Sequence, residues 1–232
     1  MEDVSRVFPP QTMSTLTKPA QHRSDGRRRP PRFELTAGNL CLDFVNTLDD
    51  RPSGQPKELL GKYDDLVRFA EDTRILTHLQ ADRLSAYGQA TPDEAGRILR
   101  DAIELREAMY AIFSAVITRH AVPASALATL NGYVQRAAQH ASLVPADEGF
   151  VWKFDSYGNS SEGLDVMLWP IVRSATDLLA SDDLPFVHAC SSPTCQWLFL
   201  DTSKNHRRRW CSMKLCGNRA KVRTFYARKR QV

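Results

Sequence analysis

The sequence predicts a mainly α-helical body with a β-hairpin and short strands, followed by a small cysteine-bearing module at the C-terminus. Apolar residues recur at helical spacings through most of the chain, and four of the five cysteines lie in its last fifth, where basic residues also gather. A chain of 232 residues is long enough for one medium domain and one small one. We therefore expect a tail at 1–31, a helical domain at 32–184 and a separate small domain at 185–232.

The first 31 residues carry few apolar side chains, several prolines and the run Arg27-Arg28-Arg29. We expect a disordered tail, because so few apolar groups cannot offset the entropy of ordering the chain. The arginine run is interpreted as solvated rather than as a binding site. The N-terminus lacks the apolar stretch of a signal peptide, and no run of about 18 apolar residues could span a membrane. We therefore expect a cytoplasmic protein that does not contact a membrane.

The next segment mixes strand and helix signals. Phe33 and Leu35 alternate with polar residues, as a short strand would. After a turn signal at Gly38, residues 40–48 fit either a helix or a strand. Residues 57–77 place their apolar side chains at helical spacings, which predicts a helix there.

A long helix is predicted from residue 92 onward. Thr91 is the expected N-cap, Pro92 occupies the first helical position, and Glu94 lies three residues after the cap, which together indicate a capping box. Apolar residues then recur every three or four positions, which predicts core packing rather than a coiled coil. This seam consists of Ile98, Ala102, Leu105, Met109, Ile112 and Val116.

Three more elements complete the body. Residues 124–139 have one apolar helical face, and residues 142–155 form two apolar runs around a turn signal, which predicts a β-hairpin. Helical spacing returns over 162–180, where Pro170 should kink or restart the helix.

The cysteines form two pairs, each with four residues between partners, and fifteen residues separate the pairs. Ordinary buried thiols would rarely show this pattern, and disulfides are rare in the cytosol. Zinc binding explains both the number and the spacing. The expected ligands are Cys190, Cys195, Cys211 and Cys216. His188 and His206 are bystanders in this interpretation, and Cys41 is a small core residue.

Around these cysteines we expect a treble-clef-like zinc finger. Residues 196–200 have a strand pattern, Arg209-Trp210 is the candidate return strand, and a helix should follow Gly217. A site with four cysteine ligands has no open position for substrate, so one structural Zn²⁺ is expected rather than a catalytic metal. The nearby aromatic residues should lie mostly in the core of the finger; they are Trp197, Trp210, Phe225 and Tyr226.

Charge is distributed unevenly along the chain. Residues 201–232 hold eleven Lys or Arg and one acid, Asp201, which leaves a net charge of +10. The other 200 residues carry 20 basic and 26 acidic side chains, a net charge of −6. A few cations could screen the negative charge of zinc bound to four thiolates, but eleven exceed that need. The excess predicts a polyanionic or acidic partner.

The last stretch, SKNHRRRWCSMKLCGNRAKVRTFYARKR, resembles the CGNR zinc finger, whose motif stands here as Cys216-Gly217-Asn218-Arg219. The segments GNLCLDFVNTLDDR, ELLGKYDDLVRFAED and ATDLLASDDL resemble the ABATE domain that precedes this finger in a family of stress-induced transcription regulators. The resemblance covers about residues 33–230. It implies a DNA-binding finger, a role in the stress response, and zinc on the four cysteines.

The first functional hypothesis is a DNA-binding transcription regulator whose helical domain senses an unidentified ligand, forms a homodimer or docks a partner. RNA is left open, because aromatic residues of the finger could stack on bases. The predicted nucleic-acid contacts are Lys204, Arg207, Arg208, Arg209, Arg219, Lys221, Arg223 and Arg228. Composition does not separate this hypothesis from a second one, a zinc-stabilised module that docks on an acidic protein.

An enzyme is the third hypothesis. Asp43, Asn46, Thr47 and Arg51 form a polar cluster that is a candidate body pocket. We favour local capping and ion pairing for these residues, because no nucleophile–base constellation accompanies them. The sequence therefore predicts a protein without catalytic activity.

Overall fold

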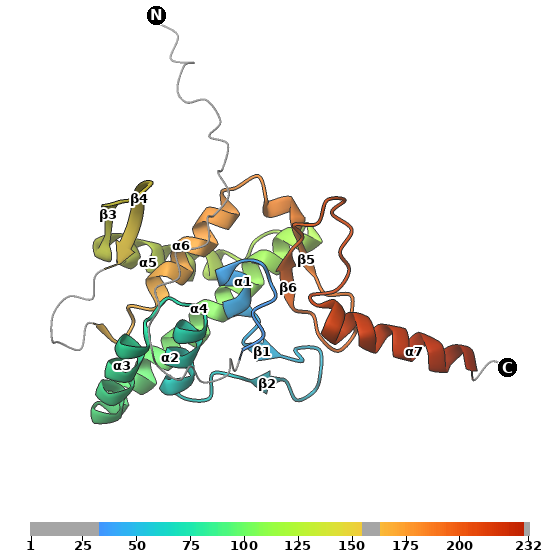
Figure 1. Ribbon diagram of the computed structural model, residues 1–232, viewed down its shortest axis with the longest axis horizontal. Coiled ribbons are helices and arrows are strands. Elements are labelled where there is room, and N and C mark those ends of the chain that lie inside the picture. Colours follow the sequence, from blue (N-terminus) through green and yellow to red (C-terminus); the bar gives the residue numbers. More distant parts are fainter. Residues whose placement is uncertain (1–32, 155–162, 230–232) are drawn as a thin grey trace, which may run out of the picture. The chain divides into compact units, whose positions relative to one another are not determined.

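The computed structural model describes residues 33–154 and 163–229, so the predicted disordered tail and its arginine run lie outside the described residues. Helices dominate the described part, which confirms the mainly α fold (Figure 1). They are α1 (Leu40–Val45), α2 (Tyr63–Asp72), α3 (His78–Ala90), α4 (Pro92–Thr118), α5 (Ala124–His140), α6 (Leu168–Leu179) and α7 (Asn218–Lys229). Within those residues no helix has the length and apolar character needed to cross a bilayer.

The described strands form three antiparallel pairs. They are β1 (Leu48–Asp49) with β2 (Lys57–Glu58), β3 (Ala141–Ala146) with β4 (Gly149–Phe154), and β5 (Val187–Ala189) with β6 (Leu198–Leu200). The β3–β4 pair confirms the predicted hairpin, whose turn is Asp147-Glu148.

The core is built around α4, which contacts α1, α2, α3, α5 and β5. The predicted seam of α4 is buried from Ile98 to Ile112, and Val116 is half-buried. The seam therefore packs in the core, as expected. The prediction of a capping box is wrong, however. The Thr91 hydroxyl donates to the Tyr87 carbonyl at the end of α3 and does not cap α4.

The N-terminal part of the body differs from the sequence-based expectation in two places. Residues 33–35 form no strand; Phe33 instead packs edge-on against Phe69 in the core, with ring centroids 5.4 Å apart. Residues 40–45 form the helix α1, which Asn39 caps by accepting a hydrogen bond from the backbone N–H of Cys41. The cap decides between helix and strand, which the apolar pattern alone did not.

Three helix predictions also change. The helix expected over 57–77 is shorter, because Lys57–Glu58 pairs with β1 and α2 begins only at Tyr63. Helix α3 was not predicted; its side chains are mostly exposed, so it lacks a strong apolar stripe. Pro170 lies in the first turn of α6, where backbone N–H groups have no partner within the helix. The N–H that proline lacks therefore costs no helical hydrogen bond, and Pro170 does not have to kink the helix.

The β5–β6 pair packs into the same hydrophobic core as the helical body. The buried Asn46 side chain donates to the Leu198 carbonyl at 2.8 Å and accepts from the Leu198 N–H at 2.9 Å. The Leu200 N–H donates to the Ala37 carbonyl at 2.8 Å. These bonds join the C-terminal strands to the segment around α1, whereas the domain division at residue 185 stays a prediction.

Candidate metal centre and nucleic-acid interface

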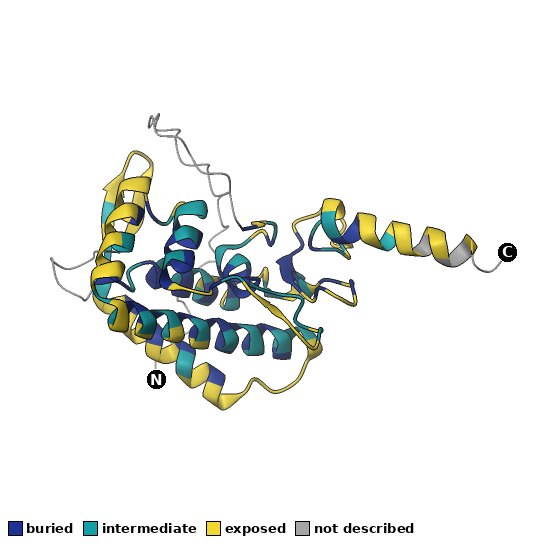
Figure 2. Cartoon of the chain, turned by 90° about the horizontal axis from the view of Figure 1, so that it is seen from below, coloured by how far each residue is buried: buried dark blue, intermediate teal, exposed yellow. Residues whose placement is uncertain are grey.

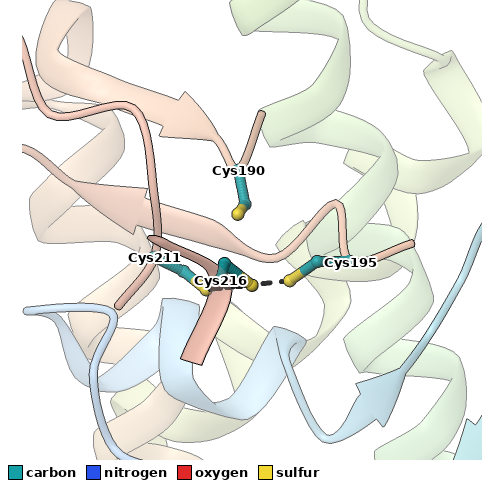
Figure 3. A group of neighbouring side chains, drawn as sticks. All are labelled: Cys190, Cys195, Cys211 and Cys216. Atoms are coloured by element: carbon teal, nitrogen blue, oxygen red, sulfur yellow. Dashed lines mark hydrogen bonds between the residues drawn. The ribbon is translucent and has the colours of Figure 1, made fainter. Parts of the chain in front are cut away.

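Four buried thiols converge near the C-terminal end of the chain (Figure 3). Cys190 follows β5, Cys195 precedes β6, and Cys211 and Cys216 come from the loop and the one-turn helix before α7. Their Sγ atoms all lie within 4.8 Å of one another. The Cys211 Sγ lies 3.7 Å from that of Cys195 and 3.6 Å from that of Cys216.

This geometry fits a tetrahedral zinc ion. Zn–S bonds of about 2.3 Å place the sulfur atoms of a tetrahedron about 3.8 Å apart, close to the spacing of these thiols. Among the described residues, the cluster of metal-binding type around this point contains only the four cysteines. His188 and His206 are not part of it, and His206 instead stacks on Phe186 at a centroid distance of 3.9 Å. Cys41 is a fully buried core residue, as predicted.

Backbone hydrogen bonds shape the first cysteine loop. The Cys190 N–H donates to the Trp197 carbonyl, which closes the loop between β5 and β6. The Ser191 N–H donates to the backbone carbonyl of Arg209 at 2.9 Å, which ties this loop to the segment before Cys211. The prediction that Arg209-Trp210 pairs with the strand at 196–200 is wrong, because β5 occupies one edge of β6, and Ala37 and Asn46 bond to β6 as well.

Gly217 packs closely against the second cysteine loop. A Cβ atom at Gly217 would lie 2.7 Å from the Met213 Sδ and 3.4 Å from the Trp210 ring. A larger residue would therefore displace the end of the flexible, half-exposed Met213 side chain. The side chains of Asn218 and Arg219 donate to the Lys214 and Leu215 carbonyls. The CGNR motif thus combines one metal ligand with three residues that pack against or bond to the turn behind it.

The Arg208 side chain forms hydrogen bonds within the protein. Its Nε donates to the Trp210 carbonyl at 2.9 Å, and its Nη2 donates to the carbonyls of Thr36, at 3.0 Å, and Cys211. Its guanidinium lies over the Phe199 ring, 4.5 Å from the centroid. The side chain therefore links the metal loops to the segment before α1, and its donors are largely used within the protein.

The other predicted nucleic-acid residues with described side chains are exposed. They are Lys204, Arg207, Arg209, Arg219, Lys221 and Arg223. Among the described residues none of them forms an ion pair with a carboxylate. The buried acid of this region, Asp201, accepts hydrogen bonds from the backbone N–H groups of Ser203 and Arg208 instead. Figure 2 shows that most of α7, the helix at the C-terminal end, is exposed. The side chain of Arg228 lies outside the described part of α7.

Two of the aromatic residues expected in the core of the finger are exposed. Trp197 is buried and Trp210 is half-buried, as predicted. Phe225 and Tyr226 are 55% and 59% exposed on α7, so their predicted burial is wrong. Their helical spacing is as expected, but α7 packs mainly against the one-turn helix Met213–Gly217 that precedes it, and the two rings stay exposed.

The predicted body pocket consists of residues that are engaged within the fold. Thr47 is buried and donates to the Phe44 carbonyl, and Asn46 bonds to Leu198. Arg51 forms two hydrogen bonds with Glu107, at 2.7 and 3.1 Å, and lies over the Tyr110 ring. Asp43 accepts from the Ala37 N–H at 2.9 Å. A ligand contact for these four residues stays a prediction.

Asp43 gives a pH-dependent prediction. Burial raises the pKa of this carboxyl to about 7, against hydrogen bonds from Ala37 and Thr36 that lower it. Between about pH 4 and pH 7 the folded state therefore holds a proton that the unfolded state releases, so the stability contribution of Asp43 falls as pH rises through this window.

The change Asp43→Asn removes this titration and keeps an acceptor for Ala37. We expect the variant to be more stable than the wild type at pH 8 by about 4 kcal/mol, with the difference shrinking toward pH 4. Urea unfolding at several pH values measures it. A stability difference that does not change with pH would contradict a raised pKa for Asp43.

Two family models match the chain. The ABATE domain, described as "Putative stress-induced transcription regulator", matches residues 38–182, which is more than half of the chain. The CGNR zinc finger matches residues 187–229. No curated protein matches this sequence. Neither family is described as enzymatic.

These matches confirm both resemblances seen in the sequence. Together with the four clustered thiols, the finger match identifies one structural zinc ion, which would hold the two cysteine loops together. The matched ranges leave only residues 183–186 between the two family regions. The chain therefore belongs to the ABATE family and carries a CGNR zinc finger after its ABATE domain.

Proposed function

We propose that this protein is a transcription regulator that binds double-stranded DNA through the basic surface of its zinc finger. The observation that carries the proposal is a contrast in ion pairing. Of the ten arginines in the described part of the body, five form ion pairs with carboxylates of described residues: Arg51, Arg68, Arg97, Arg106 and Arg173. The exposed cations of the finger form none with described residues, so their charge is available to phosphates.

The proposed contact surface comprises the loop before Cys211 and the exposed side of α7. Arg219 and Arg223 are one helical turn apart and therefore share a face of α7. Lys204 and Arg207 lie in the loop between β6 and Cys211. Helix-borne arginines can reach base edges in a major groove, while loop cations contact phosphates. We leave Arg208 out of this surface because its donors bond to backbone carbonyls.

Salt-dependent DNA binding tests the proposal. Fluorescence anisotropy of the zinc-loaded protein with a random-sequence duplex should show log K falling with log salt at a slope of about −4.5 if five phosphates are neutralised. Changing Arg207, Lys221 and Arg223 to alanine should make the slope shallower by about 2.7. The variant with Lys57, Arg100 and Arg136 changed to alanine removes the same charge from the exposed body and should bind like the wild type.

Equal loss of affinity in both triple variants would mean that net charge, not the finger surface, drives binding. Absence of binding at low salt by a zinc-loaded protein would contradict the proposal. A single-stranded RNA of the same length distinguishes RNA from duplex DNA, because stacking on Phe225 and Tyr226 would favour unpaired bases.

A second candidate function is docking on an acidic protein. The observation that favours it is the exposure of Val222, Phe225 and Tyr226 between the cations of α7. Apolar side chains rimmed by charge are typical of protein-binding surfaces. Salt-sensitive binding to polyglutamate together with indifference to DNA and RNA would support this function over the first.

A further inference from the structure

Two cavities adjoin the β3–β4 hairpin of the body. The larger, of about 640 Å³, lies between α3, β4 and the segment from Gly163 to Pro170. The smaller, of about 380 Å³, lies between α5, α6 and β4. Trp152 and Phe154 line both cavities. A pocket of this size is in the usual range of small-molecule binding sites, which is about 300–1,000 Å³.

The hairpin creates this space because its aromatic face is incompletely covered. Trp152 and Phe154 alternate along β4 and therefore point to the same side of the hairpin. On the α5 side they face the small residues Ala137 and Ala138, which cannot fill the gap. Trp152 is consequently 48% exposed, although an indole buries a large apolar area when other residues cover it.

Helix α3 supplies the opposite wall of the larger cavity. Gln80, Arg83, Leu84 and Tyr87 follow one another at spacings of three, one and three residues and share one side of the helix. Leu84 adds apolar surface there. Gln80 uses its side-chain oxygen to cap α3 through Thr77, which leaves its amide NH₂ as a donor.

Arg83 lies on the α3 wall of the larger cavity, whose described lining includes no aspartate or glutamate. No hydrogen bond or ion pair joins the Arg83 side chain to another described residue. In the smaller cavity, by contrast, the Arg173 guanidinium is paired with Asp177 at 2.7 Å and lies over the Trp152 ring. The unmatched positive charge is therefore at the α3 side, next to the aromatic wall.

We propose that the larger cavity binds an amphipathic organic anion, a carboxylate or sulfonate with an apolar chain or ring. Its acidic group contacts Arg83, and its apolar part lies against Leu84, Trp152 and Phe154. Arg83 forms a charge-assisted hydrogen bond with the acid, and the aromatic wall gains apolar cover that the described residues do not provide. The site gives the ABATE domain a ligand of stated chemistry and does not depend on the proposed DNA binding.

Calorimetric titration of the full-length, zinc-loaded protein with decanoate and with decanol tests the proposal. The two probes share the apolar chain and differ in charge. We expect decanoate to bind at one site more tightly than decanol. Arg83→Ala should weaken decanoate by about tenfold, the usual cost of losing a charge-assisted hydrogen bond, and leave decanol unchanged. Arg100→Ala removes an exposed arginine of α4 outside the cavities and should change neither affinity.

A second variant tests the location independently of charge. Leu84→Trp should fill the cavity and weaken both probes. If that variant does not fold, as judged by near-ultraviolet circular dichroism, Trp152→Ala replaces it and should weaken both probes by removing the half-exposed wall. Absence of saturable decanoate binding, or equal decanoate affinity in the wild type and Arg83→Ala, would overturn the proposal. Unchanged affinity in the cavity-filling variant would overturn it as well.

Discussion

Replacing Arg106 by alanine is expected to lower the free energy of unfolding by about 3–5 kcal/mol. Arg106 is 2% exposed in the middle of α4. Its Nη1 and Nη2 donate to both carboxylate oxygens of Glu58 at 2.6 and 2.8 Å, and its Nε donates to Glu107 at 2.8 Å. A fourth hydrogen bond, at 3.3 Å, joins Nη1 to the Thr47 hydroxyl.

The electrostatic balance of this group explains the size of the effect. Burial alone would lower the pKa of Arg106, but hydrogen bonds and charge from Glu58 and Glu107 raise it above its ordinary value. Arg51 and Arg106 in turn lower the pKa of Glu107 despite its partial burial. Removing Arg106 takes the central cation from this network and leaves a cavity in the core, so two costs add.

Arg97→Ala is the matched control on the same helix. Arg97 pairs with Asp101 one turn away, but its side chain is 53% exposed, so we expect a loss below about 1 kcal/mol. Urea denaturation followed by circular dichroism compares the two variants. A loss as small for Arg106→Ala as for Arg97→Ala would mean that the hydrogen bonds of the buried Arg106 do not stabilise the fold.

Changing Cys211 to serine is expected to abolish stoichiometric zinc binding and to destabilise the protein by more than about 5 kcal/mol. Cys211 is completely buried, and its thiol lies between those of Cys195 and Cys216. Metal binding is a large part of the folding free energy of such small modules. Cys41→Ala is the control, because it removes a buried thiol outside the cluster and should retain zinc at a smaller cost in stability.

Hydrogen exchange of the Cys211→Ser protein tests the domain division at the same time. Leu198, Phe199 and Leu200 lie in the hydrophobic core with α1, and Leu200 bonds to Ala37. We therefore expect faster exchange in residues 37–46 as well as in 187–217. Full protection of residues 37–46 in the zinc-free variant would instead support two domains that fold independently, as the sequence suggests. Zinc content measured by atomic emission shows whether the metal is lost.

Local patterns in the sequence predicted the features whose physics is local. The apolar period identified α4, α5 and the β3–β4 hairpin, because each element must bury one face at its own repeat. The two equal cysteine pairs predicted the zinc site, because closely spaced cysteine pairs are typical of structural zinc sites. Charge counts located the basic segment, because the net charge of a segment follows from its composition and does not depend on its contacts.

Tertiary contacts decided what those patterns could not. Asn46 and Leu198 are separated by 152 positions, and the sequence around neither residue indicates that they form hydrogen bonds with each other. The sequence around Glu58 does not distinguish it from other acidic residues, but in the structure β2 places it beside Arg106. Arg208 counted as one more phosphate-binding cation, yet its donors bond to three backbone carbonyls.

The sequence by itself thus determined the helical class, the zinc ligands and the charge of the C-terminal region. Only the tertiary structure decided which polar side chains hold the body and the finger together and which are exposed to a partner. The physical reason is that burial and hydrogen bonding depend on the three-dimensional neighbours of a group. For Arg208 and Arg223 those neighbours differ completely: backbone carbonyls around one and solvent around the other.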